Sequence, residues 1–146
     1  MVFGGGALGL MGTAALAARQ SGASVTGILP SFLRDVEPPL AEGETTEIVA
    51  DLFVRKQQMI ARADGFVVLP GGLGTYDEFF EVLTAAQLGV HAKPILVINE
   101  KGYFDTVDAM IRETVAKGFA RPEVLKLYAL VPDSETALDR LQALLA

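Results

Sequence analysis

Short apolar runs alternate with longer amphipathic segments along almost the whole chain of 146 residues. After a stub at 1–3, the runs predicted as strands are 24–29, 47–50, 66–69, 95–98 and 127–131. The predicted helices are 9–21, 52–62, 75–88, 104–117 and a closing helix to Leu145, with Asp51 capping the second and Asp133 or Ser134 the last. This alternation indicates an α/β fold, a parallel sheet covered by helices on both faces in three layers. The length fits one domain, 1–146.

Two glycine-rich turns each follow an apolar run and precede a helix. Gly4-Gly5-Gly6 follows the stub, and Gly71-Gly72-Leu73-Gly74 follows the run 66–69, whose unbroken apolar character predicts a fully buried strand. Ligands of parallel sheets bind at the carboxyl ends of the strands. We therefore expect both turns to contribute to one site, in which backbone N–H groups at two helix starts hold a single phosphate.

Residues 4–9 also satisfy G-x-G-x-x-G, the fingerprint of dinucleotide-binding domains. That use of the motif requires an acidic residue at the end of the second strand, where it binds the ribose hydroxyls. The second predicted strand ends in Ile28-Leu29-Pro30 and carries no acid there. The sequence therefore favours a mononucleotide over a nicotinamide dinucleotide.

The residues after the second turn, Thr75-Tyr76-Asp77-Glu78, have the pattern of a capping box. In that interpretation Thr75 is the N-cap and Glu78 reaches back to the first amides of the helix. A capping box does not need three glycines before it, whereas a phosphate-binding loop does. Both interpretations stay open at this point.

The stretch 70–78 reads P-G-G-x-G-T-x-x-E, which resembles the signature of the LONELY GUY (LOG) family, the cytokinin riboside 5′-monophosphate phosphoribohydrolases, often labelled lysine decarboxylases. Other stretches that match the family are 4–12, Gly27-Ile28-Leu29-Pro30, 51–56, 84–91 and Lys93-Pro94. Leu52, Phe53 and Ala85 depart from the usual Met, His and Trp. The resemblance implies a Rossmann-like fold from which the family's first strand, Gly-Ser-rich loop and helix are missing, so we expect the chain to begin inside a larger domain.

The resemblance also implies an activity: hydrolysis of a nucleoside 5′-monophosphate, AMP or N6-substituted AMP, to the free base and ribose 5-phosphate. It makes Glu78 and Arg55 the catalytic pair, with Glu78 facing the ribose and Arg55 orienting Glu78 and the phosphate. The positions that match substrate contacts are Gly6, Gly9, Met11, Glu37, Lys56, Gly71, Gly72, Gly74, Thr75, Asp77 and Thr84. Taken alone, Lys56 also fits a solvated helix lysine, Glu37 a surface charge, and Thr84 a helix hydroxyl near the pocket wall.

The composition of the chain favours some kinds of binding partner over others. The net charge is −6 and the pI is about 4.7, which disfavours nucleic acid and anionic membranes. The chain has no cysteine, so a reducing cytoplasm fits. Its lone histidine, His91, disfavours a His-based metal site, and we expect His91 in a loop without a partner. Hydrophobic residues form 51% of the chain, and the helix 75–88 is apolar around most of its circumference, which with the family resemblance predicts a homodimer.

Two other functions are considered. A non-catalytic protein that binds a nucleotide or a nucleotide-like ligand would need the same turns but not Arg55 and Glu78. Lysine decarboxylation by pyridoxal phosphate would need a Schiff-base lysine, and lysines 56, 93, 101, 117 and 126 have no recognisable context for one. The hydrolase interpretation requires no cofactor.

Overall fold

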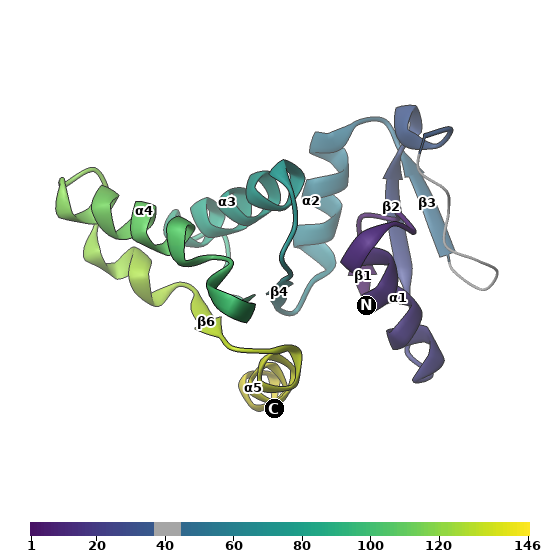
Figure 1. Cartoon of the computed structure of the whole chain (residues 1–146). Coiled ribbons are helices and arrows are strands. Elements are labelled where there is room, and N and C mark those ends of the chain that lie inside the picture. The colour runs from purple at the N-terminus through teal and green to yellow at the C-terminus, as the bar shows by residue number, and fades with distance from the viewer. Residues whose placement is uncertain (37–44) are drawn as a thin grey trace. The chain divides into compact units, whose positions relative to one another are not determined.

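The computed structural model describes residues 1–36 and 45–146, and it confirms the α/β class (Figure 1). The strands of the described residues pair in parallel, in two sheets with the orders β1-β2-β3 and β4-β5-β6. One sheet belongs to a compact unit at Met1–Ala63 and the other to a unit at Asp64–Ala146. A single domain over 1–146 stays a prediction. No helix in the described ranges has both the length and the apolar character needed to cross a bilayer.

The first unit contains β1 (Val2–Phe3), α1 (Gly9–Gln20), β2 (Thr26–Pro30), a 3₁₀ turn (Ser31–Leu33), β3 (Thr45–Val49) and α2 (Leu52–Arg62). Its core gathers Phe3, Ala15 and Val25 where α1 packs on the sheet. Asp51 caps α2 as predicted, since its carboxylate accepts a hydrogen bond from the Val54 N–H at 2.9 Å. The last turn of α2 is tied to β3 because the Arg62 guanidinium donates to both carboxylate oxygens of Glu47, at 2.8 and 2.6 Å.

The second unit contains β4 (Phe66–Val68), α3 (Leu73–Gln87), β5 (Ile95–Ile98), a 3₁₀ turn (Glu100–Gly102), α4 (Asp105–Ala116), a 3₁₀ turn (Pro122–Lys126), β6 (Ala129–Val131) and α5 (Ser134–Leu145). Leu96 and Ile98 of β5 pack against Ala137 of α5, while the alternate residues of β5 face the opposite side of the sheet. Figure 1 shows α3 and α4 on that opposite side. Because all four residues of β5 are buried, this unit has the three layers that the sequence predicts.

Three predictions about strands need correction. β4 is half-buried instead of fully buried, because it forms one edge of the β4-β5-β6 sheet while β5 takes the centre. β2 begins at Thr26 and β6 at Ala129, each two residues later than predicted. Residues 122–126 form a 3₁₀ turn immediately before β6, which uses part of the apolar run that suggested a longer strand.

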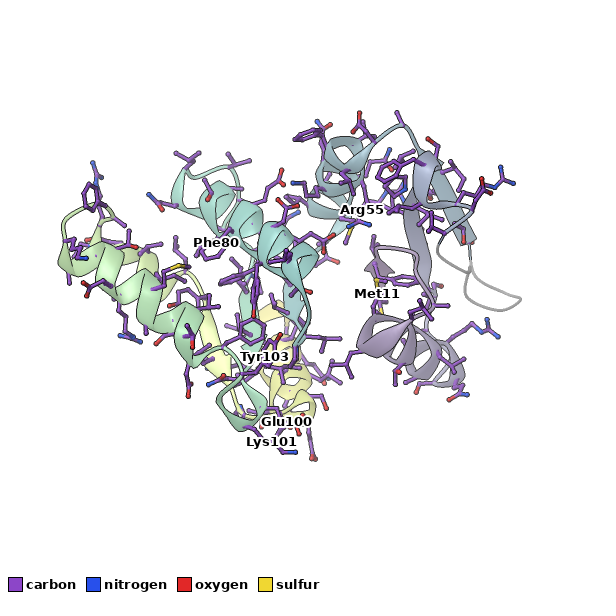
Figure 2. The ribbon with its side chains drawn as sticks, turned by 45° about the horizontal axis from the view of Figure 1, so that its top comes forward. Met11, Arg55, Phe80, Glu100, Lys101 and Tyr103 are labelled. Carbon is purple, nitrogen blue, oxygen red and sulfur yellow. The ribbon has the colours of Figure 1, made fainter. Side chains whose placement is uncertain are left out.

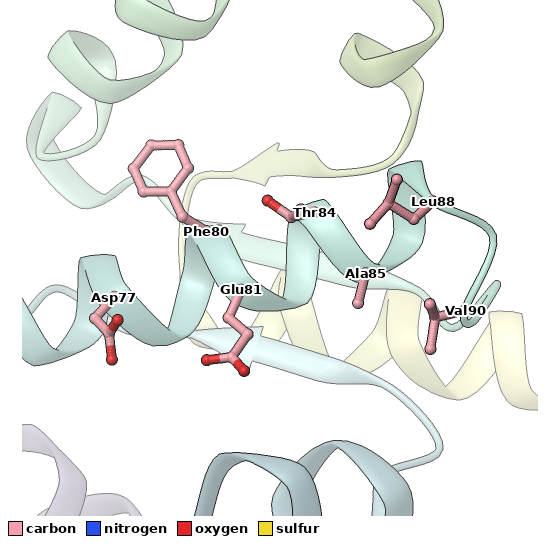
Figure 3. Close-up of a pocket in the computed structure, with 7 residues that line it drawn as sticks. All are labelled: Asp77, Phe80, Glu81, Thr84, Ala85, Leu88 and Val90. Carbon is pink, nitrogen blue, oxygen red and sulfur yellow. The ribbon is translucent and has the colours of Figure 1, made fainter. Parts of the chain in front are cut away.

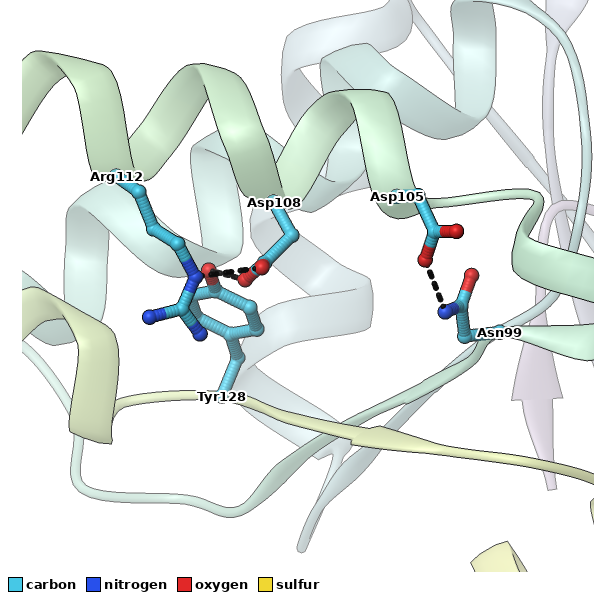
Figure 4. Close-up of polar contacts among 5 residues, drawn as sticks. All are labelled: Asn99, Asp105, Asp108, Arg112 and Tyr128. Atoms are coloured by element: carbon cyan, nitrogen blue, oxygen red, sulfur yellow. Dashed lines mark hydrogen bonds and ion pairs between the residues drawn. The ribbon is translucent and has the colours of Figure 1, made fainter.

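A polar cluster under α4 supports the second unit (Figure 4). The carboxylate of Asp108 accepts hydrogen bonds from the Tyr128 hydroxyl at 2.6 Å and from Arg112 Nε at 2.7 Å. Burial by itself would raise the pKa of Asp108, but the hydrogen bonds from Arg112 and Tyr128 outweigh it and lower that pKa. Burial, followed by the bond to Asp108, raises the pKa of Tyr128. The cluster therefore favours an ionised Asp108.

We expect Asp108→Asn to lower the Tm at pH 7 by roughly 5 °C, since charge-assisted hydrogen bonds contribute about 1.5–3 kcal/mol and 1 kcal/mol shifts Tm by about 2–4 °C at this size. A carboxylate with a lowered folded-state pKa contributes stability above its unfolded pKa and loses it as pH falls through the folded value. The Tm difference from wild type should therefore shrink below about pH 4. Thermal melts from pH 3 to 8, with the exposed Asp139→Asn as control, measure it; a constant difference would contradict the assignment.

Candidate active site

The first glycine turn connects β1 to α1 and is buried at Gly4, Gly5 and Gly6. Gly5 has a φ of +83°, a conformation that favours glycine, and a Cβ there would lie 3.2 Å from Cβ of Leu29. Gly12, in the second turn of α1, lies so close to the turn that a Cβ would collide with the Ala7 carbonyl. These glycines are therefore required by the packing of the turn itself.

Met11 of α1 and Arg55 of α2, both labelled in Figure 2, approach Gly4 of this turn. A Cβ on Gly4 would lie 3.4 Å from Nη1 of Arg55 and 3.2 Å from Sδ of Met11. Arg55 occupies the first turn of α2, directly after the Asp51 cap, and its Nε atom is buried. The structure thus brings the predicted catalytic arginine to the predicted first phosphate turn, within the first unit.

Lys56, the neighbour of Arg55 on α2, is the buried charged residue of the described core and is 8% exposed. Its Nζ atom lies 5.4 Å from the centroid of the Phe53 ring, within the range of a cation–π interaction. The interpretation of Lys56 as a solvated helix lysine is therefore wrong. A substrate-binding role for Lys56 stays a prediction.

The second glycine turn, residues 70–74, follows β4 and includes the first two residues of α3. Gly72 is the N-cap of α3, and its carbonyl accepts hydrogen bonds from the N–H groups of Thr75 at 3.0 Å and Tyr76 at 3.3 Å. The first amides of a helix have no acceptor within the helix, and they lie at the positive end of its dipole. The turn therefore offers N–H groups to an anion.

Packing requires glycine at only one of the three glycine positions of this turn. A Cβ on Gly71 would collide with the Thr75 hydroxyl. A Cβ on Gly72 or Gly74 would meet no atom within 4 Å, and neither residue has a positive φ. Neither packing nor backbone conformation in the described structure requires glycine at positions 72 and 74.

The interpretation of residues 75–78 as a capping box is wrong. α3 begins at Leu73, two residues earlier than predicted, and no side chain caps it. An extended glycine can serve as an N-cap without a side chain, so Gly72 starts the helix and places Thr75 inside its first turn. The Thr75 hydroxyl lies beside Gly71 instead. Glu78 follows one position after the exposed Asp77 and is half-buried on the face of α3 that also carries Thr75.

Other candidate residues lie farther along α3 or outside the described residues. Thr84 and Asp77 line a hollow of about 450 Å³ on α3, together with Phe80, Glu81, Ala85, Leu88 and Val90 (Figure 3). That Thr84 stands near the wall of the substrate pocket stays a prediction. Glu37 lies outside the described residues.

His91 has partners, contrary to the prediction that nothing pairs with it. Its Nδ1 accepts a hydrogen bond from the Lys93 N–H at 3.2 Å, so the proton is on Nε2, which lies 3.0 Å from the Val82 carbonyl oxygen and donates to it. The ring also packs against Phe66, with 5.3 Å between centroids. His91 thus holds the connection between α3 and β5. Across residues 1–36 and 45–146, no group of three His, Asp or Glu side chains could hold a metal ion.

Within the first unit the structure therefore brings together Gly4, Met11 and Arg55, and within the second it places Gly71, Gly72, Gly74, Thr75, Asp77 and Glu78 on one turn and one helix start. That the two sets act on one substrate stays a prediction. Sequence reasoning missed Tyr103, whose hydroxyl donates to the Gly71 carbonyl oxygen at 2.7 Å. The signal for it was present, since Tyr103 follows the carboxyl end of β5, beside β4 in the sheet.

Known proteins resemble the whole chain. The family model described as "Possible lysine decarboxylase" matches residues 11–141. A protein of Oryza sativa subsp. japonica named "Probable cytokinin riboside 5'-monophosphate phosphoribohydrolase LOGL9" is 42% identical over 145 residues, which cover 97% of this chain and 63% of that protein. An Arabidopsis thaliana protein named "Cytokinin riboside 5'-monophosphate phosphoribohydrolase LOG5" is 38% identical over 146 residues, covering 98% of this chain and 63% of the relative. The chain thus spans a little under two thirds of the length of these relatives.

Proposed function

The chain belongs to the LONELY GUY (LOG) family, and from this membership we propose that it hydrolyses the N-glycosidic bond of a nucleoside 5′-monophosphate, AMP or N6-substituted AMP. The products are the free base and ribose 5-phosphate. Water adds its hydroxyl to C1′ as the bond to the base breaks, and the base nitrogen takes up the bonding electrons and a proton.

The observation that carries this proposal is the open space at Gly74, in the first turn of α3. Glycine inside a helix is less favourable than alanine by roughly 0.5–1 kcal/mol, so an unforced glycine at position 74, the second residue of α3, needs another reason. A phosphate that approaches the backbone N–H groups closely supplies that reason, because a Cβ would stand between it and the amides. The turn at the start of α3 is therefore proposed to hold the 5′-phosphate.

The proposed chemistry uses Glu78 and Arg55. Cleavage of a sugar–base bond passes through a state with positive charge on the ribose, and a carboxylate stabilises that charge. Glu78, one turn beyond Gly74 on α3, is proposed to face the ribose and its attacking water. The Arg55 guanidinium is proposed to orient Glu78 and the phosphate, because its planar fork can bind either one through two hydrogen bonds.

The activity is tested with a panel of AMP, adenosine and L-lysine, measured by chromatography of the products. Adenine should appear from AMP, and release from adenosine should be slower by roughly 100-fold or more, because the phosphate supplies binding energy remote from the reacting bond. Equal rates with and without the phosphate would contradict the role of the turn. Release of carbon dioxide from lysine would instead support the decarboxylase description of the family model.

We also propose a homodimer in which α3 meets a second copy. Leu88 and Val90, at the end of α3, are 73% and 71% exposed, and both line the hollow that also contains Phe80. A second copy of α3 would remove this apolar surface from water.

Light scattering at micromolar concentration should therefore give a dimer mass for the wild type and a monomer mass for Leu88→Glu. The control is Phe119→Glu, which places a charge at a residue that is 84% exposed after α4, and it should remain dimeric. A monomeric wild type would contradict the proposal.

We also propose that the protein is cytoplasmic and that it binds neither nucleic acid nor a membrane. This proposal is supported by the net charge of −6 and the pI of about 4.7, which oppose binding to polyanions, and by the absence of cysteine in the composition.

A further inference from the structure

The segment that follows β5 reaches the second glycine turn. The hydroxyl of Tyr103 donates a hydrogen bond of 2.7 Å to the carbonyl oxygen of Gly71. The hydroxyl of Tyr76, on α3, in turn lies 3.4 Å from that of Tyr103 and donates to it. The two tyrosines thus form a chain of donors that ends on the backbone of the turn.

This segment is held firmly. Asn99 donates from Nδ2 to Asp105 at 2.7 Å, and its side-chain oxygen accepts from the Phe104 N–H at 2.7 Å (Figure 4). Lys101 adopts a φ of +53°, which is uncommon for a residue with a side chain and persists where the surrounding structure enforces it. Figure 2 shows Glu100, Lys101 and Tyr103 on this segment.

Ring packing also fixes the tyrosine side chain. The Tyr103 ring meets the buried Phe104 edge to face, with 5.1 Å between centroids, and the Tyr76 ring meets Phe104 in the same way at 6.2 Å. Phe104 is therefore a common support for both donors. Tyr103 is itself 45% exposed, so its ring contact with Phe104 and its bond to Gly71 are what hold the side chain in place.

The bond to Gly71 has a consequence for Gly72, because the two residues share one rigid peptide plane. In a trans peptide the C=O of one residue and the N–H of the next point in opposite directions. Among the described residues, no peptide bond is cis. A hydroxyl bound to the Gly71 oxygen therefore directs the Gly72 N–H away from Tyr103. With glycine on both sides of the plane, little else restrains its rotation.

We propose that Tyr103 is a positioning residue, which locks the Gly71–Gly72 peptide so that the Gly72 N–H is held ready for the substrate phosphate. The inference rests on the proposed function, in which this turn binds the 5′-phosphate. Tyr76 acts behind Tyr103 and contributes less, since its own hydrogen bond is longer.

Tyr103→Phe tests the proposal because it removes the hydroxyl and keeps the ring on Phe104. Loss of one oriented amide weakens phosphate binding in the substrate complex and in the transition state alike, so KM for AMP should rise about tenfold with kcat nearly unchanged. Affinity for inorganic phosphate, followed by the amide NMR signal of Gly72, should fall by a similar factor.

Two matched variants serve as controls. Tyr76→Phe should raise KM by less than Tyr103→Phe. Tyr128→Phe removes a hydroxyl that donates to Asp108 and not to the turn, and it should lower the Tm without changing phosphate affinity. A destabilised Tyr103→Phe with unchanged phosphate affinity would show a merely structural tyrosine.

The outcomes separate this inference from the proposed hydrolysis. A wild type that binds phosphate at Gly72 but leaves AMP intact would overturn the hydrolase, and a lower phosphate affinity in Tyr103→Phe would then still support the positioning role. Wild-type phosphate affinity and KM in Tyr103→Phe would overturn the positioning role and leave the hydrolase standing. No phosphate binding by the wild type would overturn both.

Discussion

Replacing Glu78 by glutamine is expected to slow base release from AMP by at least about 100-fold, within the range that a positioned acid–base group contributes. Glutamine has nearly the same size but no negative charge, so it cannot stabilise the cationic ribose. The interaction exists mainly in the transition state, and kcat should therefore fall while the affinity for AMP changes little.

The fold should tolerate Glu78→Gln because α3 starts at the carbonyl of Gly72 and not at a capping box that includes Glu78. The matched control is Glu81→Gln, three residues farther along the same helix, which should keep wild-type kcat. Thermal melting and steady-state kinetics on both variants make the comparison. Near-normal turnover by Glu78→Gln would remove Glu78 from the chemistry.

Alanine at Gly12 and alanine at Gly74 are expected to have opposite effects on stability. The Cβ of Gly12→Ala would collide with the Ala7 carbonyl, a backbone group that cannot turn away, and such overpacking costs about 1–3 kcal/mol. The Tm should therefore fall by roughly 3–10 °C. The same substitution at Gly74 meets no atom within 4 Å and should leave the Tm unchanged or raise it.

The substitution that spares stability, Gly74→Ala, should be the one that impairs substrate binding. Gly74→Ala is expected to weaken AMP binding by roughly tenfold or more, because the new Cβ occupies the space proposed for the phosphate. Calorimetric titration with AMP, beside thermal melts of both variants, measures the two effects independently. Wild-type AMP affinity in Gly74→Ala would show that the open space at the start of α3 is not a phosphate site.

Features coded by neighbouring residues could be predicted from the sequence. The Asp51 cap forms as predicted, and of the two residues predicted to cap the last helix, Asp133 or Ser134, it is Asp133 that does so, accepting from Thr136 N–H at 2.8 Å. Each cap depends on a carboxylate and an amide three residues away. The apolar run 95–98 coincides with β5. The glycine turns could be predicted too, because glycine patterns at strand ends are local signals.

Features that depend on tertiary packing, or that have no side-chain signal, could not be predicted. The start of α3 was misplaced because a glycine N-cap gives no side-chain signal, whereas Thr75 and Glu78 imitate one. The burial of Lys56 and the contact of His91 with the Val82 carbonyl come from packing that periodicity does not describe. Tyr103 likewise reaches Gly71 across 32 positions of the chain.

The most direct measurement of the central claim is a product balance with AMP as the sole substrate. The account predicts that AMP disappears while adenine and ribose 5-phosphate accumulate in a one-to-one ratio, and that Glu78→Gln leaves AMP intact under the same conditions. AMP that binds to the wild type and is recovered unchanged would contradict the account and identify the chain as a nucleotide-binding protein without hydrolase activity.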